Sequence, residues 1–523
     1  MVRTVNDPSI VLIHPPVAKP SEPPAGVAQL AGALKSHNVP YTVIDANIEG
    51  LHHLLRTLPN PEDTWSRRAS RHLDGHLQAI QTIRTYKHPD AYHRAVADLN
   101  RLLWLAGREC DVRPGLADYH DERLAPVRSA DLVQAATHPE RNPFSGYFRD
   151  RILPAVSQTR VDIAGISINY LSQALCAFAL VGLLRQAFPA LKIVLGGGLI
   201  TSWQRRPRWK DALRDWVDRA VTGPGEAVLL EMAGCKPQKK NFVPEYGDLL
   251  KNKYLSPGPI LPFSASDGCW WRRCAFCPEK AEGRPFRPLP HSRALRQLQS
   301  LARQIRPMLI HLLDNALSPA VLKTLAATPL RTPWYGFARL VPPLDDPDFC
   351  QALAASGCAM LQIGLESGNQ RVLDALAKGI RLETASRILD NLKRAGIATY
   401  VYLLFGTPAE DAQAAAKTLT FVAERREQID FLNLAIFNLP QDGPVFPDLK
   451  RRDFYPADLA LYGDFAHPGG WDRSSVRRFV EKQFKKHPAI QPIIRRDPPV
   501  FTSNHAAFFT QIFQKPDLKS SGF

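Results

Sequence analysis

The sequence predicts an α/β protein, in which a doubly wound (Rossmann-like) sheet with a helical insertion precedes a partial (β/α)6 TIM-like barrel and a C-terminal cap. Two observations carry this prediction. Short apolar runs alternate with helical patterns in two separate series, which is typical of parallel sheets. A stretch from about residue 47 to 157 interrupts the first series and has no convincing strand pattern. A chain of 523 residues has room for both series as separate domains.

The first series begins with apolar runs at 9–14 and 41–45 on either side of a helical pattern at 23–35. A strand, a helix and a strand with short joins form a βαβ unit, so we expect a parallel sheet. After the insertion, the alternation resumes at 161–168 and continues to a strand near 219–222. Open sheets of this kind bind ligands beyond the carboxyl ends of their strands. We therefore place a ligand-binding domain at residues 1–235.

Residues 236–258 are polar and lysine-rich and read as a linker. A second series follows, with helical patterns between its strands from the second strand onward. The expected strands are 260–266, 308–313, 333–337, 359–365, 398–404 and 430–436. Six such units suggest a partial barrel over 259–437, with its active site at the C-terminal ends of the strands. Residues 438–523 have a looser pattern, with one helix expected at 473–485, and we interpret them as a cap or docked tail.

Composition and charge narrow the class of protein. A hydrophobic content of 45% and a charged content of 22% are ordinary for a globular protein. The longest apolar run, 174–184, is too short to cross a bilayer, and the N-terminus lacks the apolar core of a signal peptide. We therefore expect a cytoplasmic protein. The formal charge of +16 permits an anionic partner, but we interpret it as general surface charge.

Three cysteines form the main chemical motif: Cys269, Cys274 and Cys277. Thiolates hold iron–sulfur clusters, and four of them normally fill a [4Fe–4S] cube. Three ligands would leave one iron open to a small molecule. Zinc also accepts three thiolates with a fourth ligand such as histidine, so a zinc site stays open as an alternative. The other five cysteines are scattered singly, unlike a disulfide framework.

These features together resemble the radical S-adenosylmethionine (radical SAM) superfamily, in its class with an N-terminal cobalamin-binding domain. The usual spacing of that family is Cys-x3-Cys-x2-Cys, and this chain has one extra residue in the first gap. The resemblance implies three cofactors: a [4Fe–4S] cluster on Cys269, Cys274 and Cys277, S-adenosyl-L-methionine (SAM), and cobalamin.

The resemblance also implies a set of SAM-binding residues at the barrel strand ends. Glu366 lies in the segment whose acidic residue contacts the ribose, and Arg339 offers a guanidinium for the methionine carboxylate. Asp314 and Asn315 follow the second barrel strand, where the family binds the methionine amino group. The remaining residues of this set are Phe276, Ser367 and Gly406.

Cobalamin would lie at the strand ends of the N-terminal domain, where several turns resemble the class pattern. The residues implied are Pro15, Asn47, Ser167, Asn169, Gly197, Gly198, Gly225 and Glu226. The Asp-x-His-x-x-Gly motif, whose histidine ligates cobalt in many cobalamin proteins, does not occur after Asp45. Cobalamin would then be held without that ligand, and a domain that has lost the cofactor stays an alternative.

The implied reaction is reductive cleavage of SAM to methionine and a 5′-deoxyadenosyl radical, used for cobalamin-dependent methylation of an unactivated carbon. Radical rearrangement or ring closure without methyl transfer, tRNA modification, and a zinc-bearing binding protein are the alternatives. We expect a small-molecule or peptide substrate and an electron donor such as a flavodoxin or ferredoxin. We expect neither a membrane nor a nucleic acid as partner.

Overall fold

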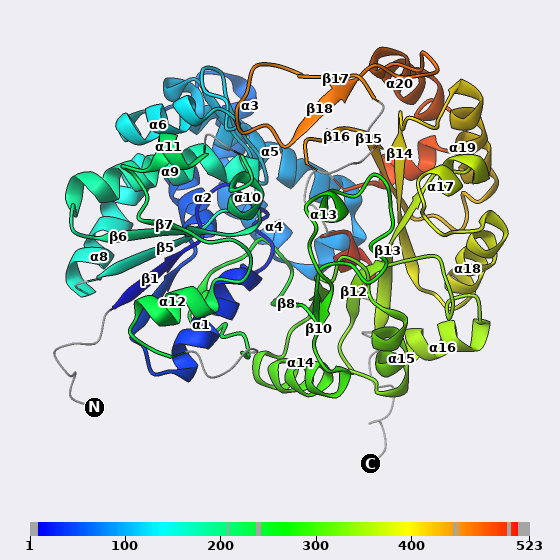
Figure 1. Cartoon of the computed structure of the whole chain (residues 1–523), viewed down its shortest axis with the longest axis horizontal. Coiled ribbons are helices and arrows are strands. Elements are labelled where there is room, and N and C mark those ends of the chain that lie inside the picture. Colours follow the sequence, from blue (N-terminus) through cyan, green and yellow to red (C-terminus); the bar gives the residue numbers. More distant parts are fainter. Residues whose placement is uncertain are drawn as a thin grey trace. The chain divides into compact units, whose positions relative to one another are not determined.

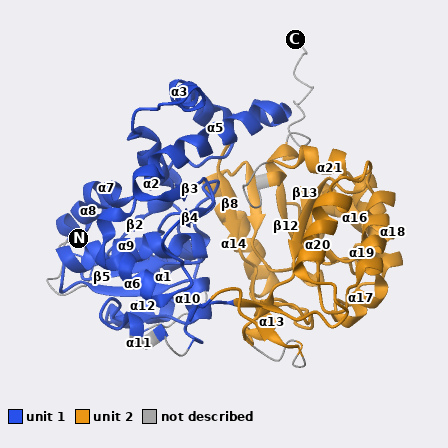
Figure 2. Cartoon of the chain, turned by 90° about the horizontal axis from the view of Figure 1, so that it is seen from above, with its two compact units in different colours: residues 1–257, 456–461, 499–502 blue, residues 258–455, 462–498, 503–523 orange. Residues whose placement is uncertain are grey.

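The computed structural model of the chain describes residues 9–159, 161–206, 209–236, 242–442, 446, 449–498 and 504–510. The chain divides into two compact units (Figure 2). Unit 1 comprises residues 1–257, 456–461 and 499–502, and unit 2 comprises 258–455, 462–498 and 503–523. Among the described residues, no helix combines the length and apolar character needed to cross a membrane.

Unit 1 contains the parallel sheet that the first apolar series predicts. Its strands follow the order β2-β1-β5-β6-β7, and each neighbouring pair is parallel. The strands are β1 (Ile10–Ile13), β2 (Tyr41–Ile44), β5 (Ile163–Ser167), β6 (Lys192–Gly196) and β7 (Arg219–Ala220). All four residues of β1 are buried, as expected for a central strand covered on both faces.

Helices cover both faces of this sheet, so the predicted doubly wound architecture is confirmed. Helices α1 (Ala25–Ser36) and α12 (Glu226–Met232) share a core with the strands on one face, and α9 (Leu171–Ala187) lies on the other (Figure 1). Helix α9 is buried along most of its length, because helix α6 (Ser129–Thr137) of the insertion packs on its outer side. Two short helices, α10 (Gly198–Trp203) and α11 (Trp209–Leu213), follow β6.

The predicted insertion is mainly helical. Its helices are α2 (Ala46–Arg56), α3 (Thr64–Arg71), α4 (Leu73–Ile80), α5 (Pro89–Gly107), α6, α7 (Ser145–Tyr147) and α8 (Leu153–Thr159). The sequence analysis did not detect one small hairpin, in which β3 (Val112–Pro114) pairs antiparallel with β4 (Tyr119–Asp121). Strands of three residues are too short to produce a recognisable alternation.

Two segments outside the sheet complete unit 1. The described part of the predicted linker packs on it: Phe242 joins the core beside α1, and the Leu255 amide donates to the Pro20 carbonyl. Residues 456–461, from the predicted cap, also belong to this unit. There the Trp203 indole donates to the Leu459 carbonyl at 2.9 Å.

Unit 2 is built on a parallel sheet of six strands in the order β15-β14-β13-β12-β11-β8. The strands are β8 (Ile260–Phe263), β11 (Leu309–Leu312), β12 (Trp334–Ala338), β13 (Cys358–Glu366), β14 (Ala398–Phe405) and β15 (Phe431–Ile436). Each lies within two residues of a predicted strand at its start, and successive strands are neighbours, as in a barrel wall. The sheet is not closed, so the prediction of a partial barrel is confirmed.

Helices join these strands and lie outside the sheet (Figure 1). They are α14 (His291–Ile305), α15 (Pro319–Ala327), α16 (Pro347–Ala355), α17 (Gln370–Ala375), α18 (Leu382–Arg394) and α19 (Ala412–Glu424). Side-chain caps mark several of their starts. Ser318, Asp346 and Asp411 each accept backbone N–H bonds in the first turn of α15, α16 and α19.

The C-terminal part of unit 2 adds short elements to the barrel. Strands β16 (Leu439–Pro440), β17 (Arg451–Arg452) and β18 (Tyr462–Phe465) form a small antiparallel sheet. The predicted helix at 473–485 is present as α20 (Arg473–Phe479) continued by a π-turn, Val480–Phe484. Helix α21 (Gln491–Arg496) and the 3-10 turn Asn504–Phe508 follow.

Candidate active site at the barrel strand ends

The three cysteines lie on the loop that follows the first barrel strand. Strand β9 (Ser266–Asp267) pairs with β10 (Arg287–Pro288), so the loop between them is closed at its base. Gly268 has a φ of +75°, and a Cβ there would meet the Pro285 carbonyl oxygen at 2.4 Å. Glycine is therefore required where the chain turns into Cys269. Cys277 ends the loop as the N-cap residue of α13 (Pro278–Ala281).

A second loop, 376–379, supports the cysteine loop. The Ala275 amide donates to the Leu376 carbonyl at 2.8 Å, and the Trp271 indole donates to the Ala377 carbonyl at 3.0 Å. Gly379 has a φ of +66°, and a Cβ there would lie 2.1 Å from the Trp271 ring. The tryptophan thus packs directly on the backbone after α17. These contacts hold the cysteine loop in one position.

Arg339 connects the cysteines to this support. Its guanidinium lies 4.4 Å from the centre of the Trp271 ring and 3.8 Å from the Cys274 sulfur. It also donates to the Lys378 carbonyl. Burial lowers the pKa of Arg339, whereas Cys274 and Cys269 act in the opposite direction. The predicted SAM residue is thus a buried cation beside two of the three thiols.

Glu366, at the end of β13, forms an ion pair with Lys378. The two charged groups are 2.8 Å apart, and their side chains are 12% and 7% exposed. Glu366 has a φ of +68°, which is unusual for a non-glycine residue and directs its side chain toward the lysine. The Lys378 ammonium also lies 5.5 Å from the centre of the Phe276 ring. Two expected residues, Phe276 and Glu366, therefore meet here around a buried lysine that the sequence analysis did not identify.

The other SAM residues predicted nearby are engaged with the protein. Asp314 is buried, and its carboxylate accepts from the Ala265 amide at 2.9 Å and from the Ser266 hydroxyl. Its bonds therefore fix the start of the cysteine loop. Asn315 is exposed and hydrogen bonds with the Glu279 carboxylate. Contact of these two residues with SAM stays a prediction.

Ser367 faces the protein interior. It is fully buried, and its hydroxyl lies 3.1 Å from the Thr418 hydroxyl and accepts from the Asn369 amide. These contacts shape the turn between β13 and α17, so the side chain sets the backbone there. Its role toward SAM stays a prediction.

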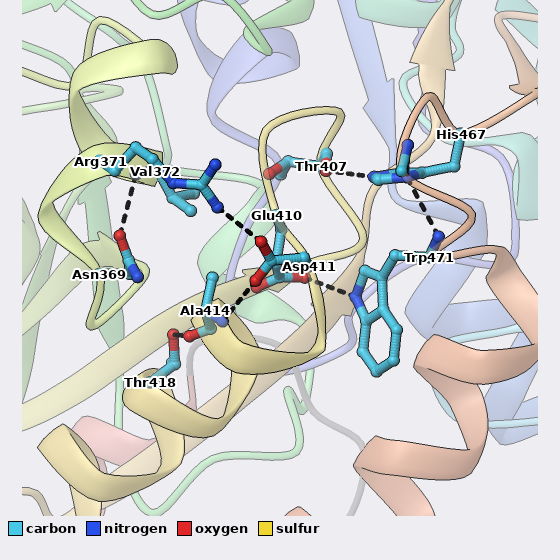
Figure 3. Close-up of polar contacts among 11 residues, drawn as sticks. Asn369, Arg371, Val372, Thr407, Glu410, Asp411, Ala414, Thr418, His467 and Trp471 are labelled. Carbon is cyan, nitrogen blue, oxygen red and sulfur yellow. Dashed lines mark hydrogen bonds and ion pairs between the residues drawn. The ribbon is translucent and has the colours of Figure 1, made fainter.

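Gly406, at the end of β14, is held by a carboxylate that the sequence analysis did not identify. Its amide donates to Glu410. The same oxygen of Glu410 accepts from the Trp471 indole at 3.2 Å, as Figure 3 shows. Trp471 is in turn oriented by His467, whose other ring nitrogen contacts the Thr407 carbonyl at 3.0 Å. Burial raises the pKa of Glu410 to about 7. The sequence signal that could have identified Glu410 is a carboxylate four residues after the glycine that ends the strand.

The cysteine loop fits the donor set of a cluster. All eight cysteines are free thiols, and three of them lie on one loop, where the Arg339 guanidinium is 3.8 Å from the Cys274 sulfur. Within the described residues, no three His, Cys, Asp or Glu side chains are grouped as they would be around a single metal ion.

The predicted cobalamin residues lie at the strand ends of unit 1, where several of them form hydrogen bonds that involve backbone groups. The Asn47 side chain accepts from the Ala18 amide at 2.9 Å and donates to the Ala18 carbonyl at 3.0 Å, which fixes the loop after β1. The Pro15 carbonyl accepts from Gln173 at 2.7 Å. Asp45 caps α2 through the Asn47 and Ile48 amides, and burial raises its pKa to about 7.

The ends of β5 and β6 are joined by a close backbone approach. Asn169 donates to the Ser167 hydroxyl at 3.2 Å and accepts from the Gly198 amide at 2.9 Å. Gly197 has a φ of +103°, and a Cβ there would meet the Ile168 carbonyl oxygen at 2.4 Å. The glycine turn thus packs directly on the backbone after β5 and on the Asn169 side chain. Ligands of open parallel sheets bind beyond such strand ends.

The last strand of the sheet ends in a similar turn. Gly225 is the N-cap residue of α12, and Glu226 is the first residue of that helix. The role of these strand ends in cobalamin binding stays a prediction.

Residues 263–422 match the model of the radical SAM superfamily. Bacteriochlorophyllide d C-12(1)-methyltransferase from Chlorobaculum tepidum is 28% identical over 110 residues, which are 21% of this chain and 24% of that protein.

Two solved structures resemble the fold. The cobalamin-dependent radical enzyme OxsB with aqua-cobalamin bound aligns at a TM-score of 0.58 and 13% identity, over 91% of this chain and 66% of that one. The methyltransferase TsrM from Kitasatospora setae, with tryptophan substrate and a SAM analog bound, aligns at a TM-score of 0.50 and 16% identity, over 82% and 73%. This chain thus spans about two thirds of the length of OxsB.

Proposed function

We propose that this chain, whose residues 263–422 match the radical SAM superfamily model, uses a [4Fe–4S] cluster and cobalamin to methylate an unactivated carbon. The observation that carries the proposal is the convergence of the cysteine loop, Arg339 and the Glu366–Lys378 pair at the strand ends of one barrel. Such strand ends are where barrel enzymes place their chemistry.

When bound, the cofactors would supply the difficult chemistry: the cluster would give the electron that cleaves SAM to methionine and a 5′-deoxyadenosyl radical, which would remove a hydrogen atom from the substrate carbon, and cobalamin would pass to that carbon a methyl group taken from a second SAM. Cys269, Cys274 and Cys277 hold the cluster, and Arg339 keeps a positive charge beside two of their sulfurs. Glu366 binds the ribose hydroxyls, and Lys378 holds its carboxylate in place. Gly406 and Phe276 provide close-fitting surfaces for the adenine.

Methyl transfer is supported by the relatives, two of which are named as methyltransferases. Open space around Gly223, with nothing within 4 Å of an added Cβ, supports a place for a corrin ring at this sheet edge of unit 1. Radical rearrangement or ring closure would use the same SAM site without methyl transfer.

A low-potential electron donor, such as a flavodoxin or ferredoxin, is the partner that this reaction requires. Arg272 and Arg273 lie inside the cysteine loop and are exposed, and among the described residues neither has an acidic side chain within ion-pair distance. They give the surface beside the cluster a positive charge. We propose that an acidic donor protein docks there.

Anaerobic reconstitution of the full chain tests the function. The expected result is a brown protein with about four irons that forms 5′-deoxyadenosine from SAM under reducing conditions. Cys274→Ala should abolish both properties, whereas Cys110→Ser, a change at a lone half-buried cysteine of unit 1, should leave them unchanged. A colourless protein holding one zinc would overturn the radical function.

The methyl-transfer part has its own measurement. The protein is expressed anaerobically with added cobalamin, and the bound cofactor is measured by mass spectrometry. One cobalamin per chain is expected. Formation of 5′-deoxyadenosine without any bound cobalamin would favour the rearrangement or ring-closure chemistry instead.

A further inference from the structure

Unit 1 contains a pocket of about 630 Å³ that lies outside the strand ends of its sheet. Its walls come from helix α2, helix α4 and residues 251–253, with Tyr147 and Arg151 at one side. None of the eight residues predicted to bind cobalamin lines it. Ligand pockets in proteins typically have volumes of about 300–1,000 Å³. The pocket is therefore large enough for a molecule of the size of a nucleotide.

The floor of the pocket is apolar and aromatic. Ile48, Leu77 and Tyr147 contribute to it, and each is less than 7% exposed. The Tyr147 hydroxyl is directed to the Glu49 carboxylate at 2.9 Å, and the His53 ring packs against the tyrosine at 5.8 Å between ring centres. The floor thus offers flat apolar surfaces to a ligand.

The rim of the pocket is positive. Four cationic side chains line it, Arg56, Arg151, Lys251 and Lys253, against the two carboxylates Glu49 and Asp74. Glu49 is already occupied, because it accepts from Tyr147 and from Arg151 at 3.2 Å. Asp74 reaches Arg56 only at 3.9 Å, and both side chains are more than 60% exposed.

Two cations therefore remain for a ligand. Arg151 is paired with Glu49, and Lys251 with Asp248 at 2.7 Å. No described carboxylate lies within ion-pair distance of Lys253, and the contact of Arg56 with Asp74 is long. His52 also lines the pocket: burial lowers its pKa, the contact with the Lys253 backbone raises it, and the charges of Arg56 and Lys253 lower it. The imidazole ring is also fixed, since its Nε2 atom lies 2.9 Å from the Lys253 carbonyl oxygen. Two cationic side chains thus lie on the rim of a pocket that also has buried apolar lining residues.

We propose that this pocket is a second small-molecule site, which binds a flat, partly apolar molecule carrying one phosphate or carboxylate group. The apolar body would rest on Ile48, Leu77 and Tyr147. The anionic group would lie between Arg56 and Lys253, with the His53 ring within reach. This site is independent of the proposed radical reaction, since it uses no residue of either cofactor site.

Fluorescence titration of the intact chain with 1-naphthyl phosphate tests the proposal, with 1-naphthoate as the carboxylate probe and 1-naphthol as the neutral analogue. We expect saturable binding of at least one anion, at least tenfold tighter than that of 1-naphthol. Arg56→Glu with Lys253→Glu should weaken it at least tenfold. Arg67→Glu reverses an exposed charge on α3 outside the pocket and should leave binding unchanged.

Several results would overturn the proposal. Equal binding of 1-naphthol would show that charge plays no part, and an equal effect of Arg67→Glu would show that only general surface charge acts. Displacement of the probe by hydroxocobalamin or by SAM would assign it to a cofactor site. The melting temperature of each variant is measured in parallel. His53→Ala keeps both cations, and it serves as a second variant of the pocket if the double charge reversal unfolds the chain.

Discussion

The ammonium group of Lys378 lies 2.8 Å from the Glu366 carboxylate, and neither side chain is more than 12% exposed. Removing one partner of a nearly buried pair leaves the other charge uncompensated, which costs about 3–5 kcal/mol. We expect Lys378→Met to lower the free energy of unfolding by about this amount and to weaken SAM binding at least tenfold, measured by denaturation and by calorimetry.

Two further variants separate the pair from general effects. Lys323→Met removes an exposed lysine on α15 and should change neither quantity. Glu366→Gln combined with Lys378→Met should recover most of the stability, since no unpaired charge is left, but not the SAM affinity. Full recovery of SAM binding in the double variant would argue against Glu366 as a ribose ligand.

Gly379→Ala should displace the cysteine loop. The added Cβ would lie 2.1 Å from the Trp271 ring, and the residue has a φ of +66°. Gly396→Ala is the matched control, because its φ is +75° but nothing lies within 4 Å of an added Cβ. The two variants share a backbone cost of about 1–2 kcal/mol. We expect a loss of reconstituted iron in Gly379→Ala alone. Equal iron contents in the two variants would show that the contact between Trp271 and the backbone at Gly379 does not hold the cysteine loop in place.

The sequence predicted the two sheets because parallel strands covered by helices leave clear apolar runs. It also predicted the cysteine loop, since three thiols at close spacing have few other uses. It did not identify Lys378 or Glu410, because each meets its partner only after a turn whose path depends on packing. Asn47 and Ser367 were predicted to bind cofactors because they lie at strand ends. In the structure, their side chains hydrogen bond with Ala18 and Thr418. Spacing places a residue at a strand end and leaves its side-chain direction open.

Gly197→Ala should disrupt the cobalamin edge of unit 1. Its Cβ would meet the Ile168 carbonyl oxygen at 2.4 Å, and the φ of +103° is strained for any other residue. The neighbouring Gly196 has nothing within 4 Å of an added Cβ, so Gly196→Ala is the control. We expect a lower melting temperature and a loss of bound cobalamin in Gly197→Ala only. Unchanged cobalamin content in a folded Gly197→Ala protein would place the cofactor elsewhere.

Glu410 should make the stability of unit 2 depend on pH near neutrality. Burial raises its pKa from 4.5 to about 7 in the folded chain, so the folded state holds a proton that the unfolded state releases. The stabilisation from this proton is complete below about pH 4.5 and is lost as the pH rises through about 7. The shift corresponds to about 3 kcal/mol.

Glu410→Gln is the informative change, because an amide can still accept from the Gly406 amide and the Trp471 indole without carrying a charge. We expect the parent to lose stability between pH 5.5 and pH 8.5, whereas the variant, which has no proton to lose at this position, does not. The difference in free energy of unfolding between parent and variant should therefore favour the parent more at pH 5.5 than at pH 8.5. Denaturant midpoints measured between these pH values check this. Asp411→Asn, at the exposed N-cap of α19, is the neighbouring control, and its curve should stay parallel to that of the parent over this range, since its pKa is lowered and it stays charged throughout. Parallel curves for Glu410→Gln as well would mean that Glu410 stays ionised in the folded chain.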